Sequence, residues 1–123
     1  EIRTMKRLVR RDYLPAINNY AAEVARNIFQ VREVMADADL SPQEARLRQL
    51  TEGAARVNVL LEKLHELHYA SLEITDQQER ANMNAHEIIP VMDDLRAAVD
   101  AMEIIVAHEH WPVPTYNEIL FYA

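Results

Sequence analysis

The chain has 123 residues, half of them apolar, with a formal net charge of −7, one glycine and no cysteine. This length and apolar content suit one domain with one core. The missing cysteines exclude disulfide scaffolds and thiolate metal sites, and one glycine is too few for the turns of an all-β fold. Alanine, leucine, glutamate and arginine favour helix and indicate an all-α protein. Without an apolar run of membrane-spanning length or a signal peptide, we expect a cytoplasmic protein with no membrane partner.

The first predicted helix runs from about residue 2 to residue 35. Apolar residues recur along residues 17–35 at alternating steps of four and three, the spacing of a helix that packs in a bundle. Pro15 lies inside this helix, where it removes one backbone hydrogen bond and crowds the carbonyl of Arg11. We therefore expect a kink at Pro15.

The second helix is predicted over residues 42–74. Ser41 is expected to cap it, Pro42 suits the first helical position, and Glu44 would complete a capping box. Its apolar positions alternate by three and four and form a stripe wide enough to contact two neighbouring helices. Gly53 lies in the middle of this helix, where it is expected to permit close helix packing.

The third helix is predicted to start at Thr75 and Asp76, because each is followed three residues later by Gln or Glu. Pro90 lies inside this helix, about as far from the helix start as Pro15 lies in the first. Short connections between long helices make neighbours antiparallel. The predicted fold is therefore all-α: an up-down-up bundle of three long antiparallel helices over residues 1–110, with kinks at Pro15 and Pro90 at similar heights.

Residues 111–123 form a second predicted unit, a proline-aromatic tail. Two residues that each precede a proline, Trp111 and Val113, are held in extended backbone. Thr115 and Glu118 then form a capping box that opens a helix of barely two turns, which is too short to be stable alone and too apolar to lie in water. We expect this short C-terminal helix to dock on a larger surface.

Several histidines raise the question of a metal site. Glu62 and His65 have the Glu-x-x-His spacing of di-metal bundles, but no second pair accompanies them. His68 follows one turn after His65, and its position in the apolar stripe is also explained by a hydrogen-bonded side chain. His108 and His110 are two positions apart at a helix end and face different ways. With no cysteine nucleophile and no glycine-rich loop either, we predict no catalytic residue, metal ligand or cofactor site in this chain.

The first 11 residues are basic, with a charge of +4, whereas the remaining 112 carry −11. Cations in a first helical turn oppose the helix dipole. Either more chain precedes Glu1, or these charges pair with an acidic surface. A nucleic-acid-binding arm is the alternative, but the overall negative charge argues against nucleic acid as a partner. We prefer a contact with another part of the same protein.

Three parts of the sequence resemble a known family. The string Trp111-Pro112-Val113-Pro114-Thr115-Tyr116-Asn117-Glu118-Ile119-Leu120-Phe121, after a Leu95-Arg96-Ala97-Ala98-Val99-Asp100 helix, is similar to the C-terminus of type III glutamine synthetases. The stretches Arg3-Thr4-Met5, Val9-Arg10-Arg11-Asp12 and Leu14-Pro15-Ala16 resemble the helix that leaves the catalytic region in that family. Ile88-Ile89-Pro90-Val91-Met92 is similar to its internal proline helix. Asn117 stands where glycine is common, and Ile119 replaces a leucine.

The resemblance implies a non-catalytic C-terminal helical domain with a structural or oligomerisation role. The parent enzyme would be a homo-oligomer that forms glutamine from glutamate, ammonia and ATP with a divalent metal such as Mg²⁺, and its catalytic residues would lie upstream of Glu1. The implied partners are that catalytic domain and neighbouring subunits. A free-standing helical-bundle interaction or oligomerisation protein is the alternative. The residues expected at the interface are Arg3, Lys6, Arg7, Arg10, Arg11, Trp111, Tyr116, Leu120 and Phe121.

Overall fold

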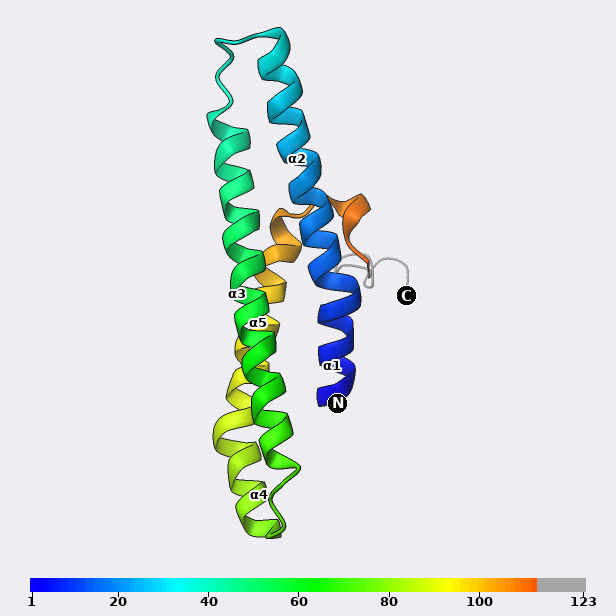
Figure 1. Ribbon diagram of the computed structural model, residues 1–123, viewed down its shortest axis with the longest axis vertical. Helices are drawn as coiled ribbons and strands as arrows, with labels where there is room; N and C mark the ends of the chain where they lie inside the picture. The colour runs from blue at the N-terminus through cyan, green and yellow to red at the C-terminus, as the bar shows by residue number, and fades with distance from the viewer. Residues whose placement is uncertain (113–123) are drawn as a thin grey trace.

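A computed structural model describes residues 1–112, which form helices and contain no strand. The α-helices are α1 (Ile2–Leu8), α2 (Leu14–Val34), α3 (Ser41–Ser71), α4 (Gln77–Met83) and α5 (Ile89–Ile105). A π-helical turn, η1 (Val9–Tyr13), joins α1 to α2, a second, η2 (Asn84–Ile88), joins α4 to α5, and η3 (His108–His110) is a 3₁₀ turn. Figure 1 shows α3 running beside α2 and then beside α4 and α5 in the opposite direction. The prediction of an all-α fold is confirmed.

The prediction of three long helices is wrong in its detail, because only α2 and α3 are long α-helices, with 21 and 31 residues. Each proline is the second residue of the α-helix that follows a π-helical turn. The Leu14 N–H donates to the carbonyl of Val9, and the Ile89 N–H to that of Asn84, five residues back in each case. A π-helical turn therefore precedes each proline, where a kink was expected. We attribute it to relief of the clash between the proline ring and the carbonyl four residues earlier.

The two prolines also lie at different heights, contrary to prediction. Tyr13, just before Pro15, stacks on Trp111 beyond the end of α5. Ile89, just before Pro90, instead lines a cavity together with Glu1 and Ile2 at the start of α1. The prediction assumed that both helical segments begin at the same end of the bundle. Figure 1 shows that α4 begins well beyond α1, so the segments are staggered.

The core is centred on α3, which packs against α2 and α5. Its three-four spacing turns one stripe of apolar side chains inward, as predicted. Burial of each such side chain stabilises the fold by about 1.5–3 kcal/mol. Fully buried side chains from the three segments include Leu50, Val57, Leu61 and Leu64 of α3, Ile17 of α2, and Leu95 of α5. None of the helices in residues 1–112 is long and apolar enough to cross a membrane.

Gly53 permits a close approach of α3 and α5. A Cβ atom at this position would lie 2.2 Å from both Sδ and Cε of Met102, a buried residue of α5. The side chain of Met102 therefore occupies the space that any other residue at position 53 would fill. The prediction that Gly53 allows close helix packing is confirmed.

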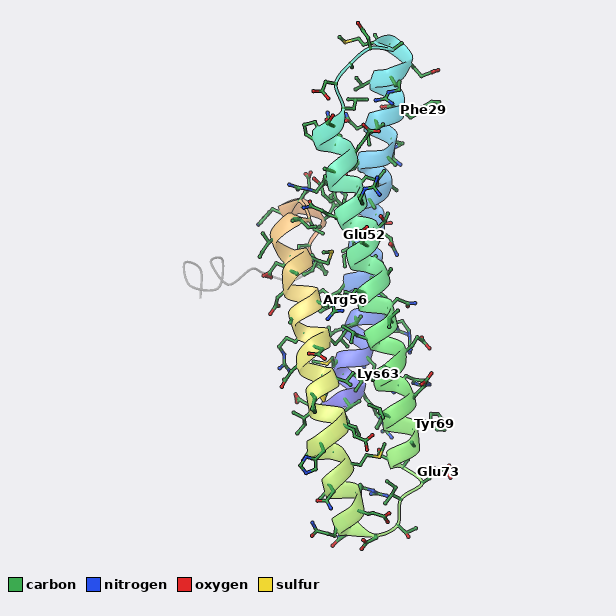
Figure 2. All side chains as sticks on the ribbon, turned by 90° about the vertical axis from the view of Figure 1, so that its left-hand side faces the viewer. Phe29, Glu52, Arg56, Lys63, Tyr69 and Glu73 are labelled. Atoms are coloured by element: carbon green, nitrogen blue, oxygen red, sulfur yellow. The ribbon has the colours of Figure 1, made fainter. Side chains whose placement is uncertain are left out.

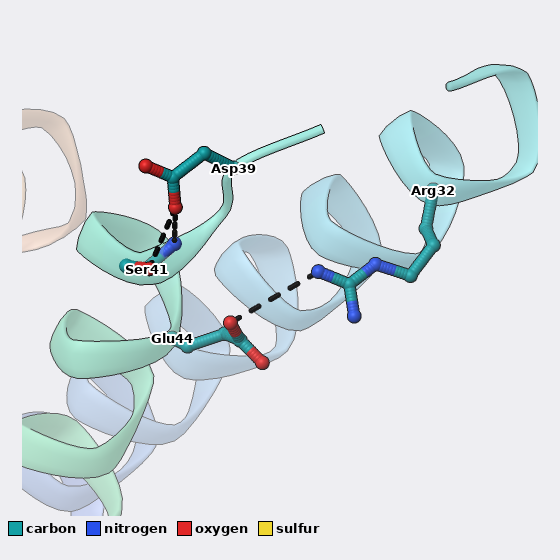
Figure 3. A network of polar contacts seen from close by, with 4 residues as sticks. All are labelled: Arg32, Asp39, Ser41 and Glu44. Atoms are coloured by element: carbon teal, nitrogen blue, oxygen red, sulfur yellow. Dashed lines mark hydrogen bonds and ion pairs between the residues drawn. The ribbon is translucent and has the colours of Figure 1, made fainter. Parts of the chain in front are cut away.

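The start of α3 differs from the prediction (Figure 3). Ser41 is the first helical residue and not the cap. The Asp39 carboxylate accepts hydrogen bonds from the Ser41 backbone N–H, at 3.1 Å, and from its hydroxyl, at 2.6 Å. These bonds lower the pKa of Asp39. Glu44 forms no capping box but lies 4.0 Å from the guanidinium of Arg32 in α2.

The start of the third segment is as predicted. Asp76 is the N-cap of α4, and its carboxylate accepts a hydrogen bond from the Glu79 backbone N–H at 3.2 Å. This bond satisfies one of the N–H groups that a helix start leaves without a partner.

Candidate interaction surfaces

Of the five basic side chains expected at an interface near the N-terminus, only Lys6 is half-buried. Its Nζ lies 3.2 Å from Nδ1 of His65 and 3.1 Å from Nδ1 of His68, both on α3. The other four are exposed, and within residues 1–112 none of them forms an ion pair with a carboxylate. They are Arg3, Arg7, Arg10 and Arg11. The basic cluster thus divides into one residue that attaches α1 to α3 and four that face solvent.

The Lys6 site depends on the protonation of two histidines. An ammonium group only donates hydrogen bonds, so both histidine Nδ1 atoms must accept, which requires neutral rings. Burial lowers the pKa of His68, and the charges of Lys6 and Arg3 lower it further. Burial also lowers the pKa of Lys6, with added effects of Arg10 and Arg3. The expected hydrogen-bonded role of His68 is confirmed, whereas His65, expected to be solvated, also contacts Lys6.

Among the described residues, the histidines and the glutamate with metal-ligand spacing in the sequence, Glu62, His65 and His68, do not form a cluster of ligand atoms. The one group of ligand atoms there within 4.8 Å of one another comes from Glu23, Glu109 and His110. His110 Nε2 contacts the Glu23 carboxylate, and its ring packs at a tilt on Tyr20, with centroids 5.4 Å apart. These contacts attach η3 to α2. Sequence analysis missed this pair because its members are 87 positions apart.

Trp111 packs against the first helical segment, beyond the end of α5. It is 9% exposed, and its ring stacks on that of Tyr13, with centroids 5.2 Å apart and planes at 26°. The buried indole Nε1–H meets no acceptor within residues 1–112. Burial raises the pKa of Tyr13, and the carboxylate of Glu103 raises it further. Trp111 therefore packs on its own chain; the other expected tail anchors, Tyr116, Leu120 and Phe121, lie outside the described residues.

A groove of about 240 Å³ runs between the α1–η1 segment and α5, next to the Trp111–Tyr13 stack. The polar residues that line it are Glu1, Thr4, Arg96 and Asp100. The apolar and aromatic side chains that line it are those of Met5, Leu8, Val9, Tyr13, Leu95 and Val99. A concave apolar surface with a few polar groups at its edge is typical of a binding site.

Three curated proteins are similar to this chain. A glutamine synthetase of Butyrivibrio fibrisolvens is 27% identical over 119 residues, 96% of this chain, and a type-3 glutamine synthetase of Dictyostelium discoideum is 29% identical over 112 residues, 88% of the chain. A glutamine synthetase of Bacteroides fragilis is 20% identical over 125 positions, 98% of the chain. The chain resembles glutamine synthetases over almost its whole length. The resemblance drawn from the tail and the proline helices is thereby confirmed.

The chain spans only 15% to 17% of the length of these glutamine synthetases. No family model and no solved structure matches it. The glutamine synthetase relatives are thus much longer proteins, and the chain corresponds to a small part of each.

The outward face of α3 in this glutamine synthetase-like chain is charged. Figure 2 shows Glu52, Lys63 and Glu73 along the exposed side of α3, with Tyr69 among them, whereas Arg56 lies at the edge of that side and lines a groove with residues of α5. Mixed charges along one side of a helix are typical of a solvent-exposed face. This face therefore offers a matched control for tests of the basic side chains on α1.

Proposed function

We propose that the chain is a non-catalytic, C-terminal helical domain of a glutamine synthetase, with a structural or oligomerisation role. The observation that carries this proposal is the contrast in coverage: 88% to 98% of the chain aligns with only 15% to 17% of each relative. The parent enzyme would form glutamine from glutamate, ammonia and ATP with Mg²⁺. In the parent, catalysis would belong to residues outside this chain, and we expect the parent to be cytoplasmic and homo-oligomeric.

The chemistry of the sequence supports a role other than catalysis. Phosphate groups of nucleotides are commonly held by backbone N–H groups of glycine-rich loops. The only glycine of this chain, Gly53, lies in the middle of α3 and packs against Met102. ATP would therefore have to bind elsewhere in the parent protein.

The exposed basic side chains of α1 are the proposed contact with the rest of the parent. Arg3, Arg7 and Arg10 follow one another at steps of four and three, so they share one side of the helix. An acidic surface on the catalytic domain or on a neighbouring subunit would complement them, and would also relieve the unfavourable placement of cations at a helix N-terminus. Trp111 packs on Tyr13 of its own chain, so the proposed contact with the parent rests on these arginines and not on the tail.

Charge reversal in the full-length parent tests this contact. A triple variant, Arg3→Glu, Arg7→Glu and Arg10→Glu, is compared with a matched control at three exposed basic residues of α3, Arg48→Glu, Arg56→Glu and Lys63→Glu. Light scattering after size-exclusion chromatography gives the oligomer mass, and calorimetry gives Tm. We expect a smaller assembly or a lower Tm in the α1 variant alone. Intact assemblies of unchanged Tm in both variants would contradict the proposed interface.

A free-standing helical-bundle interaction or oligomerisation protein is the second candidate. Exposed apolar side chains near the connection between α2 and α3 favour it, because Phe29 is 67% exposed and Val34 is 85% exposed. The nucleotide sequence upstream of Glu1 in the source gene separates the two candidates. An encoded catalytic domain supports the glutamine synthetase proposal, whereas a start codon beside Glu1, with a stable dimer of the chain in solution, supports the second candidate.

A further inference from the structure

The apolar groove between α1–η1 and α5 lies close to the point where the described part of the chain ends. We propose that this groove is the docking site of the chain's own C-terminal residues 113–123. The inference concerns contacts within one chain, so it holds whether or not the parent protein is a glutamine synthetase.

The position of Trp111 supports this occupant. Its ring stacks on Tyr13, with centroids 5.2 Å apart, and Tyr13 is itself one of the residues that line the groove. The described chain ends one residue later, at Pro112. The last 11 residues therefore start beside one end of the groove, with a buried aromatic side chain fixing that starting point.

The length and composition of residues 113–123 also match the groove. The lining extends along the first segment from Tyr13 back to Glu1, about 18 Å at 1.5 Å per residue. Eleven residues span at most about 36 Å when extended and about 17 Å as a helix, so the tail can cover this distance. Its sequence contains Val113, Ile119, Leu120 and Phe121 but only one charged residue, Glu118. Apolar side chains of this kind gain free energy when the apolar lining removes them from water.

Covalent attachment favours the chain's own tail over that of a second copy. A segment tethered by a short linker is present near its site at a millimolar effective concentration. At micromolar protein concentrations, the tail of another copy is about a thousandfold more dilute. The groove is therefore filled within one chain before it can recruit a partner.

Methyl NMR of the full 123-residue chain tests the proposal. The variant Leu120→Asp with Phe121→Asp makes the tail charged and leaves every residue of the described core unchanged in sequence. We expect shift changes in the methyl groups of Leu8, Leu95 and Val99, which line the groove, and none in those of Val59 on the exposed side of α3. The control variant Val34→Asp with Met35→Asp adds the same two negative charges at another exposed site, at the end of α2, and should leave the groove methyls unchanged. Groove methyls that do not respond to the tail variant would overturn the proposal.

A second measurement does not depend on altering the tail's apolar residues. The chain has no cysteine, so Ala123→Cys provides a unique attachment point for a nitroxide label. We compare methyl signal intensities with the nitroxide in its paramagnetic form and after its reduction. We expect the paramagnetic form to reduce the intensity at least twofold at the Leu8 or Val99 methyl groups, and not to reduce it at those of Val59. Intensities that are the same before and after reduction of the nitroxide at all three residues would overturn the proposal. A mixed sample separates docking within one chain from docking between copies. One set of chains carries the nitroxide but no isotope label, and the other carries the isotope label but no nitroxide. Intensity loss in this mixture would show docking between copies and would also overturn the proposal.

Discussion

Replacing Gly53 by alanine tests the close contact of α3 with α5. In an unhindered helix this change stabilises by about 1 kcal/mol, because glycine is less favourable than alanine by roughly that amount. Here the added Cβ would lie 2.2 Å from Sδ and Cε of Met102. Carbon contacts are optimal at about 3.5–4.0 Å, so Met102 must change rotamer or α5 must shift. Overpacking of this kind costs about 1–3 kcal/mol.

The two effects oppose each other, and the steric effect is the larger. We expect Gly53→Ala to lower the free energy of unfolding by between about 0 and 2 kcal/mol. The measurement is urea unfolding followed by circular dichroism at 222 nm, with the slope checked for constancy. Ala55→Gly is the control, since Ala55 is an exposed neighbour in the same helix and its replacement reports helix propensity alone.

A double variant isolates the steric contact. Met102→Ala alone should cost about 2–5 kcal/mol through the cavity it leaves. In that background the obstructing atoms are gone, so Gly53→Ala should now stabilise by about 1 kcal/mol, and the sign of its effect reverses. The resulting coupling energy should be about 1–3 kcal/mol. A Gly53→Ala change that stabilises equally in both backgrounds would refute the reasoning.

Three further predictions concern other sites. Because the folded chain lowers the pKa of His68 below 6.5, the unfolded state binds the proton more readily; the free energy of unfolding should fall as pH drops below 6.5. Urea unfolding between pH 5 and 8 should show this loss reduced in His68→Gln, and an unchanged pH dependence would contradict it. Asp76→Ala should cost about 1 kcal/mol by removing the cap of α4, measured by thermal unfolding, whereas no loss would mean that the cap is dispensable. Trp111→Ala should lower the free energy of unfolding by about 3–5 kcal/mol. Trp111→Phe should lower it by less than about 1.5 kcal/mol, because the indole N–H has no acceptor within residues 1–112. Equal losses for the two variants in chemical denaturation would refute this.

Features that depend on neighbours in sequence could be predicted. The three-four spacing of apolar residues predicts Leu50, Leu61 and Leu64 on one side of a helix, and all three are buried. Asp76 was predicted at a helix start because its capping partner, Glu79, lies only three residues away. The role of Gly53 followed from its isolation within a strongly helical stretch. In each case the deciding interaction is set by the helical repeat.

The local competition at helix starts was harder to predict. Ser41 has the residue type and position of a cap, yet Asp39 accepts its hydrogen bonds. Both residues can act as acceptors at a helix N-terminus, and their energies differ too little for sequence to choose between them. The prolines showed the same limit: their effect on the helix was foreseen, but a wider turn, rather than a bend, accommodates each ring.

The sequence by itself determined that this chain is helical and which side of each helical segment is apolar, because these properties depend on residues within one or two turns of each other. Only the tertiary structure decided that Lys6 meets His65 and His68, that His110 meets Glu23, and that Pro15 and Pro90 lie at different heights. All three depend on the axial offset between helices. A repeating apolar stripe can pack at several offsets, so the choice among them rests on the summed contacts of the whole bundle.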